Sequence, residues 1–133
     1  MKRLLQLIVA VAAAHGVVPA AHAAYPDKPV KIIVPQTPGG GTDMLARLLA
    51  QRLSQRWGEG VVVENKPGAG GALGLEFVAK SPADGYTLVM SSDGPQAINV
   101  SLYKSLPYDA VKDFTPIATV GSISFLIATR NTS

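Results

Sequence analysis

Short apolar runs alternate with helical patterns in the middle of the chain, and this alternation restricts the fold more than any other feature. Three mostly apolar runs, 30–34, 61–63 and 86–90, have the length and composition of buried strands. Helical segments at 43–57 and 72–80 separate them. A β-α-β-α-β order predicts an α/β fold, in which a mostly parallel sheet carries helices on its faces.

The segment 43–57 is the most strongly patterned helix. An apolar residue recurs at every fourth position, which predicts one apolar face, at Leu45, Leu49, Leu53 and Trp57. Thr42 is the predicted N-cap, and Asp43 stands where the positive end of the helix dipole favours an anion. Gly58 is expected to end the helix.

Beyond residue 90 the pattern is weaker. The segment 97–103 predicts one or two helical turns, and 106–109 is expected to be irregular. Two further apolar runs, 116–120 and 124–129, predict strands.

The N-terminal residues have the three parts of a secretory signal peptide. Lys2 and Arg3 form a positive start, residues 4–14 form an almost unbroken apolar run, and Ala21-His22-Ala23 has the small residues of a cleavage site. A membrane anchor, the alternative, needs about 20 continuous apolar residues, and this run is much shorter. We predict that residues 1–23 are removed, with the cut after Ala23 or one residue later.

The absence of cysteine excludes several classes of protein. It excludes a disulfide scaffold, a thiolate metal site and a lipid-modified cysteine that would tether an exported protein. Both histidines, His15 and His22, lie in the predicted signal peptide. The rest of the chain therefore has no histidine-based triad, and we expect no metal and no cofactor. We expect a free periplasmic protein that is not membrane-anchored.

The charge balance does not favour nucleic acid as a partner. The formal net charge is +3, and removal of Lys2 and Arg3 with the signal peptide leaves +1. The remaining basic residues are scattered and have no aromatic residues interleaved among them. We therefore expect no nucleic-acid binding.

Polar or glycine-rich loops follow the three predicted strands, at 35–42, 65–71 and 91–95. In an open parallel sheet such loops share one edge, where ligands bind. The first two loops also open helices, so backbone N–H groups and positive helix ends are expected to converge there. The pattern predicts an anion or carboxylate site built from backbone. In the other interpretation, the glycines only form tight turns.

Motifs for nucleotide binding and catalysis are incomplete. Met44 and Leu73 occupy the third-glycine positions of the dinucleotide fingerprint, and no glycine is followed by lysine. The G-x-S-x-G motif is absent around Ser91, and Glu64 is interpreted as a solvated charge. Asp43 could be a helix-start anion or a crevice group. We predict a binding protein with no catalytic residues; an exported hydrolase or transferase using Ser91 or Asp43 is the alternative.

Four motifs, PGGGTD, VVENKPGAGG, ADGYTL and LPYDAVKDFTPI, closely resemble those of the tripartite tricarboxylate transporter receptors, the Bug solute-binding proteins. The resemblance implies a fold like that of type II periplasmic-binding proteins. In this fold two α/β domains close on a small organic acid, a carboxylate or its amide, and deliver it to a membrane permease. It also implies which loop residues bind the ligand: Gly39, Gly40, Gly41, Thr42 and Asp43, then Gly68, Ala69, Gly70 and Gly71, then Ser91 and Ser92.

The chain departs from the family pattern at several positions. Gln36-Thr37 replaces an aromatic residue and a proline, and Asn99-Val100 replaces Asn-Pro. Asp93 adds a charge that would disfavour an anionic ligand if it pointed inward. Family members are also much longer. We therefore expect residues 24–133 to be the first α/β domain of a receptor, truncated before domain 2. A non-functional fragment or an interaction module is the remaining interpretation.

Overall fold

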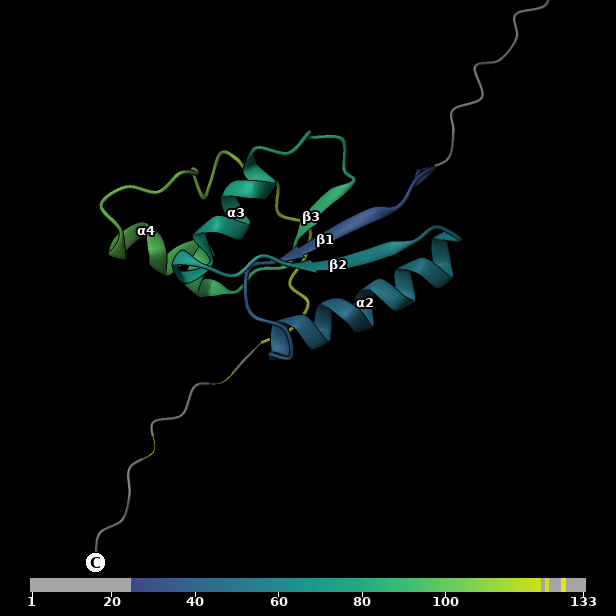
Figure 1. The fold of residues 1–133 in the computed structure, drawn as a ribbon, viewed down its shortest axis with the longest axis horizontal. Coiled ribbons are helices and arrows are strands. Elements are labelled where there is room, and N and C mark those ends of the chain that lie inside the picture. Colours follow the sequence, from purple (N-terminus) through teal and green to yellow (C-terminus); the bar gives the residue numbers. More distant parts are fainter. Residues whose placement is uncertain (1–24, 123, 125–127, 129–133) are drawn as a thin grey trace, which may run out of the picture.

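The computed structural model describes residues 25–122, 124 and 128. Three parallel strands form its sheet, in which β1 (Val30–Val34) lies between β2 (Val61–Asn65) and β3 (Thr87–Val89). The helix α2 (Gly41–Trp57) connects β1 to β2, and α3 (Ala72–Ala79) connects β2 to β3. Figure 1 shows α2 and α3 on opposite faces of the sheet. The predicted α/β fold with a parallel sheet is confirmed.

The central strand β1 is buried on both faces. Val30, Ile32, Ile33 and Val34 are each at most 2% exposed. Side chains alternate along a strand, and Ile32 and Val34 pack against Ala46 and Ala50 of α2. The opposite face of the sheet has its own cluster, which includes Leu75 of α3 and Val89 of β3. Burial on both faces explains why this strand is a nearly continuous apolar run.

The start of α2 differs from the prediction that Thr42 caps it. The helix begins at Gly41, and Gly40 is the N-cap, whose carbonyl accepts the first helical bond from Met44 N–H at 3.0 Å. Gly40 has no side chain to cap the helix; instead the Asp43 carboxylate reaches back and accepts from Gly39 N–H at 2.9 Å. Because Asp43 orders this turn, no capping side chain is needed before the helix.

The end of α2 agrees with the prediction. Gly58 adopts the left-handed conformation, with φ 74°, and its N–H donates to Ser54 O at 3.0 Å. A glycine reaches this conformation without a Cβ penalty, so the helix ends where the sequence indicates.

The buried face of α2 is narrower than its apolar pattern. Ala46 and Ala50 contact the sheet, since their small side chains let the helix lie close to it. Leu48 and Met44 are 53% and 66% exposed. Leu49 also packs against the core cluster that contains Ala46 and Ala50. The apolar row predicted from the sequence lines an open groove beside the sheet: Leu45, Leu49, Leu53 and Trp57.

Glycines let α3 approach the end of β1. A 3₁₀ turn, Ala69–Gly71, precedes the helix. A Cβ on Gly71 would lie 2.5 Å from the Pro95 ring. A Cβ on Gly74 would lie 2.7 Å from Pro35 Cβ and 2.9 Å from Lys66 O. Only glycine fits at these contacts, so the glycine content of this stretch serves packing as well as turning.

The chain after β3 is helical and then irregular. A π-helical turn, Gly94–Ile98, leads into the short α4 (Asn99–Leu102), in line with the predicted helical turns. The predicted strand at 116–120 is wrong. The sheet of the described residues contains β2, β1 and β3, and residues 116–122 form no strand pairing with it; Ile117 to Ser122 instead line the groove together with α2 residues.

Several predictions fall where the structure gives no description. The signal peptide, 1–23, lies outside the described residues, and so does most of the predicted strand at 124–129. None of the helices between residues 25 and 122 is long and apolar enough to cross a membrane.

We expect Gly74→Ala to lower the free energy of unfolding by about 1–3 kcal/mol, because the new methyl group would overpack against Pro35 and the Lys66 carbonyl. Urea denaturation of Gly74→Ala and of the unsubstituted chain measures the difference in the free energy of unfolding. Gly60→Ala is the matched control: its Cβ would lie 3.8 Å from Pro29 Cβ, an ordinary contact. Equal midpoints for Gly74→Ala and the unsubstituted chain would show that the close approach is not needed.

Candidate ligand-binding site

The three strands end at the same edge of the sheet. The register pairs Val34 with Asn65 and Ile33 with Val89. Directly beyond, Lys66 N–H donates to Val34 O at 2.8 Å. Gln36, shortly after the end of β1, connects the first loop to the third: its Nε2 donates to Ser92 Oγ at 3.1 Å. The predicted meeting of strand-end loops at one edge is therefore confirmed.

Asp43 is the centre of the first loop's hydrogen-bond network. Its Oδ2 accepts from Gly39 N–H at 2.9 Å and from Arg47 Nε at 3.0 Å. Its Oδ1 accepts from Asn65 Nδ2 at 2.9 Å and lies 3.0 Å from Arg47 Nη2. Asp43 is only 3% exposed, and its acceptor capacity is used within the protein. Of the two interpretations left open by the sequence, the structure supports the helix-start anion.

These contacts also hold Asp43 in its charged form. Hydrogen bonds from Arg47, Gly39 and Asn65 lower the pKa of Asp43 from 3.8 to about 2. The paired Arg47 guanidinium offsets the negative charge beside the helix N-terminus. An anionic ligand at this edge would consequently meet less repulsion than an unpaired Asp43 carboxylate would cause.

Asn65 is a site residue that the sequence analysis did not identify. Its Nδ2 donates to Gln36 O at 3.1 Å as well as to Asp43, and its Oδ1 accepts from Arg47 Nη2 at 2.9 Å. It therefore ties the end of β2 to both ends of the first loop. The available signal was an amide side chain at the carboxyl end of an apolar strand.

The first turn of α2 presents unpaired backbone donors. The helix makes its first bond at Met44, so the N–H groups of Gly41, Thr42 and Asp43 have no partner within it. Gly39, Gly40 and Gly41 are exposed. A Cβ on Gly39 would meet no atom within 4 Å. This open space and the positive helix end suit an anionic oxygen.

A groove of about 1190 Å³ extends along α2 from this edge. At the strand-end edge it is lined by polar side chains that include Thr42, Ser91 and Ser92. Towards the other end its walls are aromatic and aliphatic, with Trp57 and Leu53 among them. The groove thus combines a mostly apolar wall with a few polar groups, as small-molecule sites do.

The second glycine-rich loop lies outside this groove. Gly68, Ala69 and Gly70 are exposed and Gly71 is buried, but none of them is among its lining residues. The loop is held by Asn99, a 5% exposed residue whose Nδ2 donates to Gly70 O at 3.0 Å. Gln36 and Thr42 of the first predicted loop therefore line one groove with Ser91, Ser92 and Asp93 of the third. Gly39, Gly40 and Gly41, like the second loop, are not among its lining residues.

Two other carboxylates lie near this edge. Asp93 is exposed and is among the groove-lining residues, so the negative charge noted in the sequence does border the groove. Its Oδ1 accepts from the Gly94 N–H at 3.0 Å, capping the π-helical turn. Glu64 pairs with Lys66 and Lys31, whose hydrogen bonds lower its pKa. Glu64 is thus a paired surface charge, close to the solvated charge that was predicted.

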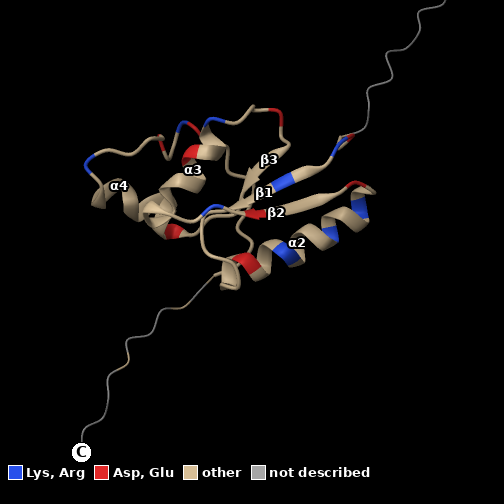
Figure 2. Cartoon of the chain, in the orientation of Figure 1, with Lys and Arg blue, Asp and Glu red and all other residues tan. Residues whose placement is uncertain are grey.

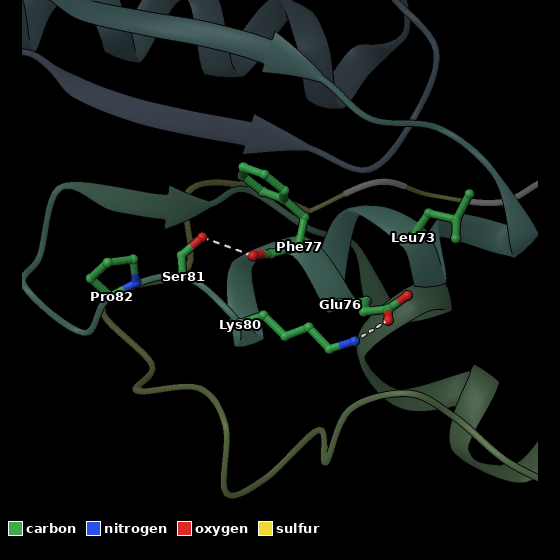
Figure 3. A pocket seen from close by; sticks show the side chains of 6 residues that line it. All are labelled: Leu73, Glu76, Phe77, Lys80, Ser81 and Pro82. Carbon is green, nitrogen blue, oxygen red and sulfur yellow. Dashed lines mark hydrogen bonds and ion pairs between the residues drawn. The ribbon is translucent and has the colours of Figure 1, made fainter.

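A second, smaller hollow of about 460 Å³ lies against α3 (Figure 3). Its polar groups already satisfy one another: Glu76 pairs with Lys80, and Ser81 Oγ donates to Phe77 O at 2.8 Å. The remaining lining residues, Leu73 and Pro82, are apolar. No buried polar side-chain atom of these lining residues is left without a partner to orient a ligand, so the hollow is a weaker candidate than the groove.

The charged residues of the described chain are spread along its length. Figure 2 shows basic and acidic residues interspersed over helices, strands and loops without a continuous basic stripe. Across the described part of the chain, no three His, Asp or Glu side chains gather as a metal site would require.

Comparison with known proteins identifies the family. A profile described as "Tripartite tricarboxylate transporter family receptor" matches residues 45–133. Protein BugT of Bordetella pertussis is 44% identical over 132 residues, which is 98% of this chain. The chain belongs to the tripartite tricarboxylate transporter receptor family. The resemblance drawn from its motifs is therefore confirmed.

Solved structures of receptor proteins share its fold. The chain is similar to Rpa4515 of R. palustris with adipate, at 46% identity and a TM-score of 0.67 over 69% of this chain and 31% of that one. It is also similar to MatC from Rhodopseudomonas palustris with bound malate, at 38% identity and a TM-score of 0.69, over 72% and 33% of the two chains. A further match is the periplasmic binding protein BugD. The chain spans about 40% of BugT.

The Asp43 network predicts acid-sensitive stability in this family member. The pKa of Asp43 in the folded chain, about 2, lies below its ordinary 3.8. The charged carboxylate therefore stabilises the fold fully above pH 3.8, and this stabilisation is lost as the pH falls towards 2. We expect Asp43→Asn to be less stable than the unsubstituted chain at neutral pH, with a difference that shrinks in acid.

Urea midpoints measured from neutral to acidic pH test this. Glu59→Gln is the control, since no ion pair of Glu59 occurs among the described residues, and it should follow the unsubstituted chain. A stability difference for Asp43→Asn that is the same at every pH would contradict the electrostatic role of the carboxylate.

Proposed function

We propose that this receptor-family chain binds a small organic carboxylate, or its amide, at the carboxyl edge of its sheet. The observation that carries the proposal is the first turn of α2: the N–H groups of Gly41 and Thr42 have no partner within the helix, Gly41 is exposed, and Thr42 lines the groove. Adipate and malate, the molecules named with two of the similar structures, are both dicarboxylates. Their chemistry matches that of the site.

In this proposal the ligand is held by donors and undergoes no chemical change. Backbone N–H groups of Gly41 and Thr42 would donate hydrogen bonds to one carboxylate oxygen, with hydroxyls of the third loop on the facing side. Asp43 would position the loop rather than touch the ligand, because Arg47, Asn65 and Gly39 already occupy its oxygens. The exposed glycines allow the ligand to approach the backbone.

We further propose that residues 24–133 form one wall of a two-walled clamp. The groove is open along α2 and leaves its lining residue Leu45 37% exposed. The similar structures are about three times as long as the part that matches. A second domain would supply the opposite wall, and a membrane permease would receive the ligand from the closed form.

An enzymatic role is less well supported. Ser91 Oγ donates to the adjacent Ser92 carbonyl at 3.2 Å, and no histidine occurs after His22 to activate it. The lowered pKa of Asp43 makes it a poor general base near neutral pH. The relatives are receptors, so we favour binding without catalysis.

The family's periplasmic members and the signal-like N-terminus support export. Expression of the full chain in a Gram-negative host should yield a periplasmic product whose N-terminus is Ala24 or Tyr25, as read by intact-mass spectrometry. Ile8→Arg, which interrupts the apolar run, should keep the precursor out of the periplasm. An intact Met1 on membrane-bound protein would contradict the cleaved signal peptide.

Ligand binding can be tested on the processed chain by NMR titration with adipate and malate. We expect weak, millimolar binding, since half of the contact surface would come from the second wall. The backbone amides of Gly40, Gly41 and Thr42 should shift, and hexane-1,6-diol should leave them unchanged. The absence of any shift would contradict the site. Tight, micromolar binding would contradict the need for a second wall and would disprove the clamp.

A further inference from the structure

Gln36 and Ser92 form a hydrogen-bonded pair that connects the first and third loops. Gln36 follows the fully buried Pro35 at the end of β1, and Ser92 follows β3. Gln36 Nε2 donates to Ser92 Oγ at 3.1 Å. Both side chains are half-buried and both line the groove. In the sequence Gln36 stands out only as a departure from the family pattern.

The two neighbouring serines use their hydroxyl hydrogens differently. Ser91 Oγ donates to Ser92 O at 3.2 Å, so its hydrogen is already committed to the backbone. Ser92 Oγ accepts from Gln36, and within the described residues its own hydrogen has no acceptor. A hydroxyl that accepts a hydrogen bond is polarised into a better donor. Ser92 is therefore the serine that can donate into the groove.

Gln36 itself is not fully satisfied. Its Oε1 is buried and has no hydrogen-bond partner among the described residues. An unpaired buried acceptor is costly to the fold, and such a group calls for an explanation. The unpaired Oε1 means that the stability of the fold does not by itself explain why a glutamine occupies this position. Its contact with Ser92 is the feature that bears on the groove.

We propose that Gln36 holds the Ser92 hydroxyl as a hydrogen-bond donor for an anionic oxygen of the ligand. Ser92 makes the contact and Gln36 is a positioning residue. The pair favours a carboxylate over the corresponding neutral amide, because a hydrogen bond to a charged oxygen is the stronger one. This inference rests on the proposed binding of organic carboxylates at the same edge.

The first test needs no ligand. In the ¹⁵N-labelled processed chain, Ser92→Ala should move the side-chain amide resonances of Gln36, because their acceptor is removed. Ser91→Ala is the matched control and should leave them in place. Equal effects of the two substitutions, or none from Ser92→Ala, would overturn the pairing and with it the inference.

The second test is an adipate titration of the same chains. Ser92→Ala should weaken binding about tenfold or more, as expected for a hydrogen bond to a charged group. Gln36→Leu should weaken it about three- to tenfold. Gln36→Glu should be as damaging as Ser92→Ala, since a carboxylate would accept the Ser92 hydrogen. Thr37→Ala is the matched control: Thr37 is exposed and is not among the groove-lining residues, so adipate binding should stay within about twofold.

The outcomes separate this inference from the proposed function. If adipate shifts the amides of the first loop equally in all variants, the donor role of Ser92 is wrong and the carboxylate site stands. If adipate shifts no first-loop amide in the unsubstituted chain, both proposals fall. A glutaric acid and glutaramide pair, titrated into the unsubstituted chain and Ser92→Ala, measures the preference: Ser92→Ala should lose the advantage of the acid.

Discussion

The burial of β1 on both of its faces is the constraint on which the rest of the structure depends. Val30, Ile32, Ile33 and Val34 are excluded from solvent only if a helix covers each side of the sheet. Parallel strands then need crossover connections, which return each strand end to the same edge. The binding edge is therefore a consequence of the core. Pro35 continues this burial beyond the strand and brings the start of the first loop under α3.

The buried carboxylate of Asp43 organises that edge. Four interactions, with Gly39, Arg47 and Asn65, connect the loop, the helix and the neighbouring strand. Because the charge is paired, it stabilises the loop without opposing the positive end of α2. The unpaired N–H groups of the first helical turn are left for a ligand. A residue that could be read as catalytic thus serves to hold the donors in place.

The groove along α2 is open in a chain that spans about 40% of the length of BugT. The apolar row Leu45, Leu49, Leu53 and Trp57 has the spacing of a core-facing helix, yet the sheet is covered by Ala46 and Ala50 beside it. Periodicity identifies an apolar face but not what covers it. The segment 116–120 shows the same limit: its β-branched residues suit a strand, but a strand exists only where a neighbour provides a ladder.

The sequence alone determined the order of strands and helices, the parallel sheet, the end of α2 at Gly58 and the edge where the loops meet. These follow from local preferences and from the handedness of connections, which are encoded in short stretches of chain. Only the tertiary structure decided that Asp43 is a buried anchor, that Asn65 and Gln36 connect the loops by hydrogen bonds, and that Gly68 to Gly71 lie outside the groove. Each of these depends on hydrogen bonds or contacts between residues far apart in the sequence. Such pairings cannot be predicted from the spacing of residues along the chain.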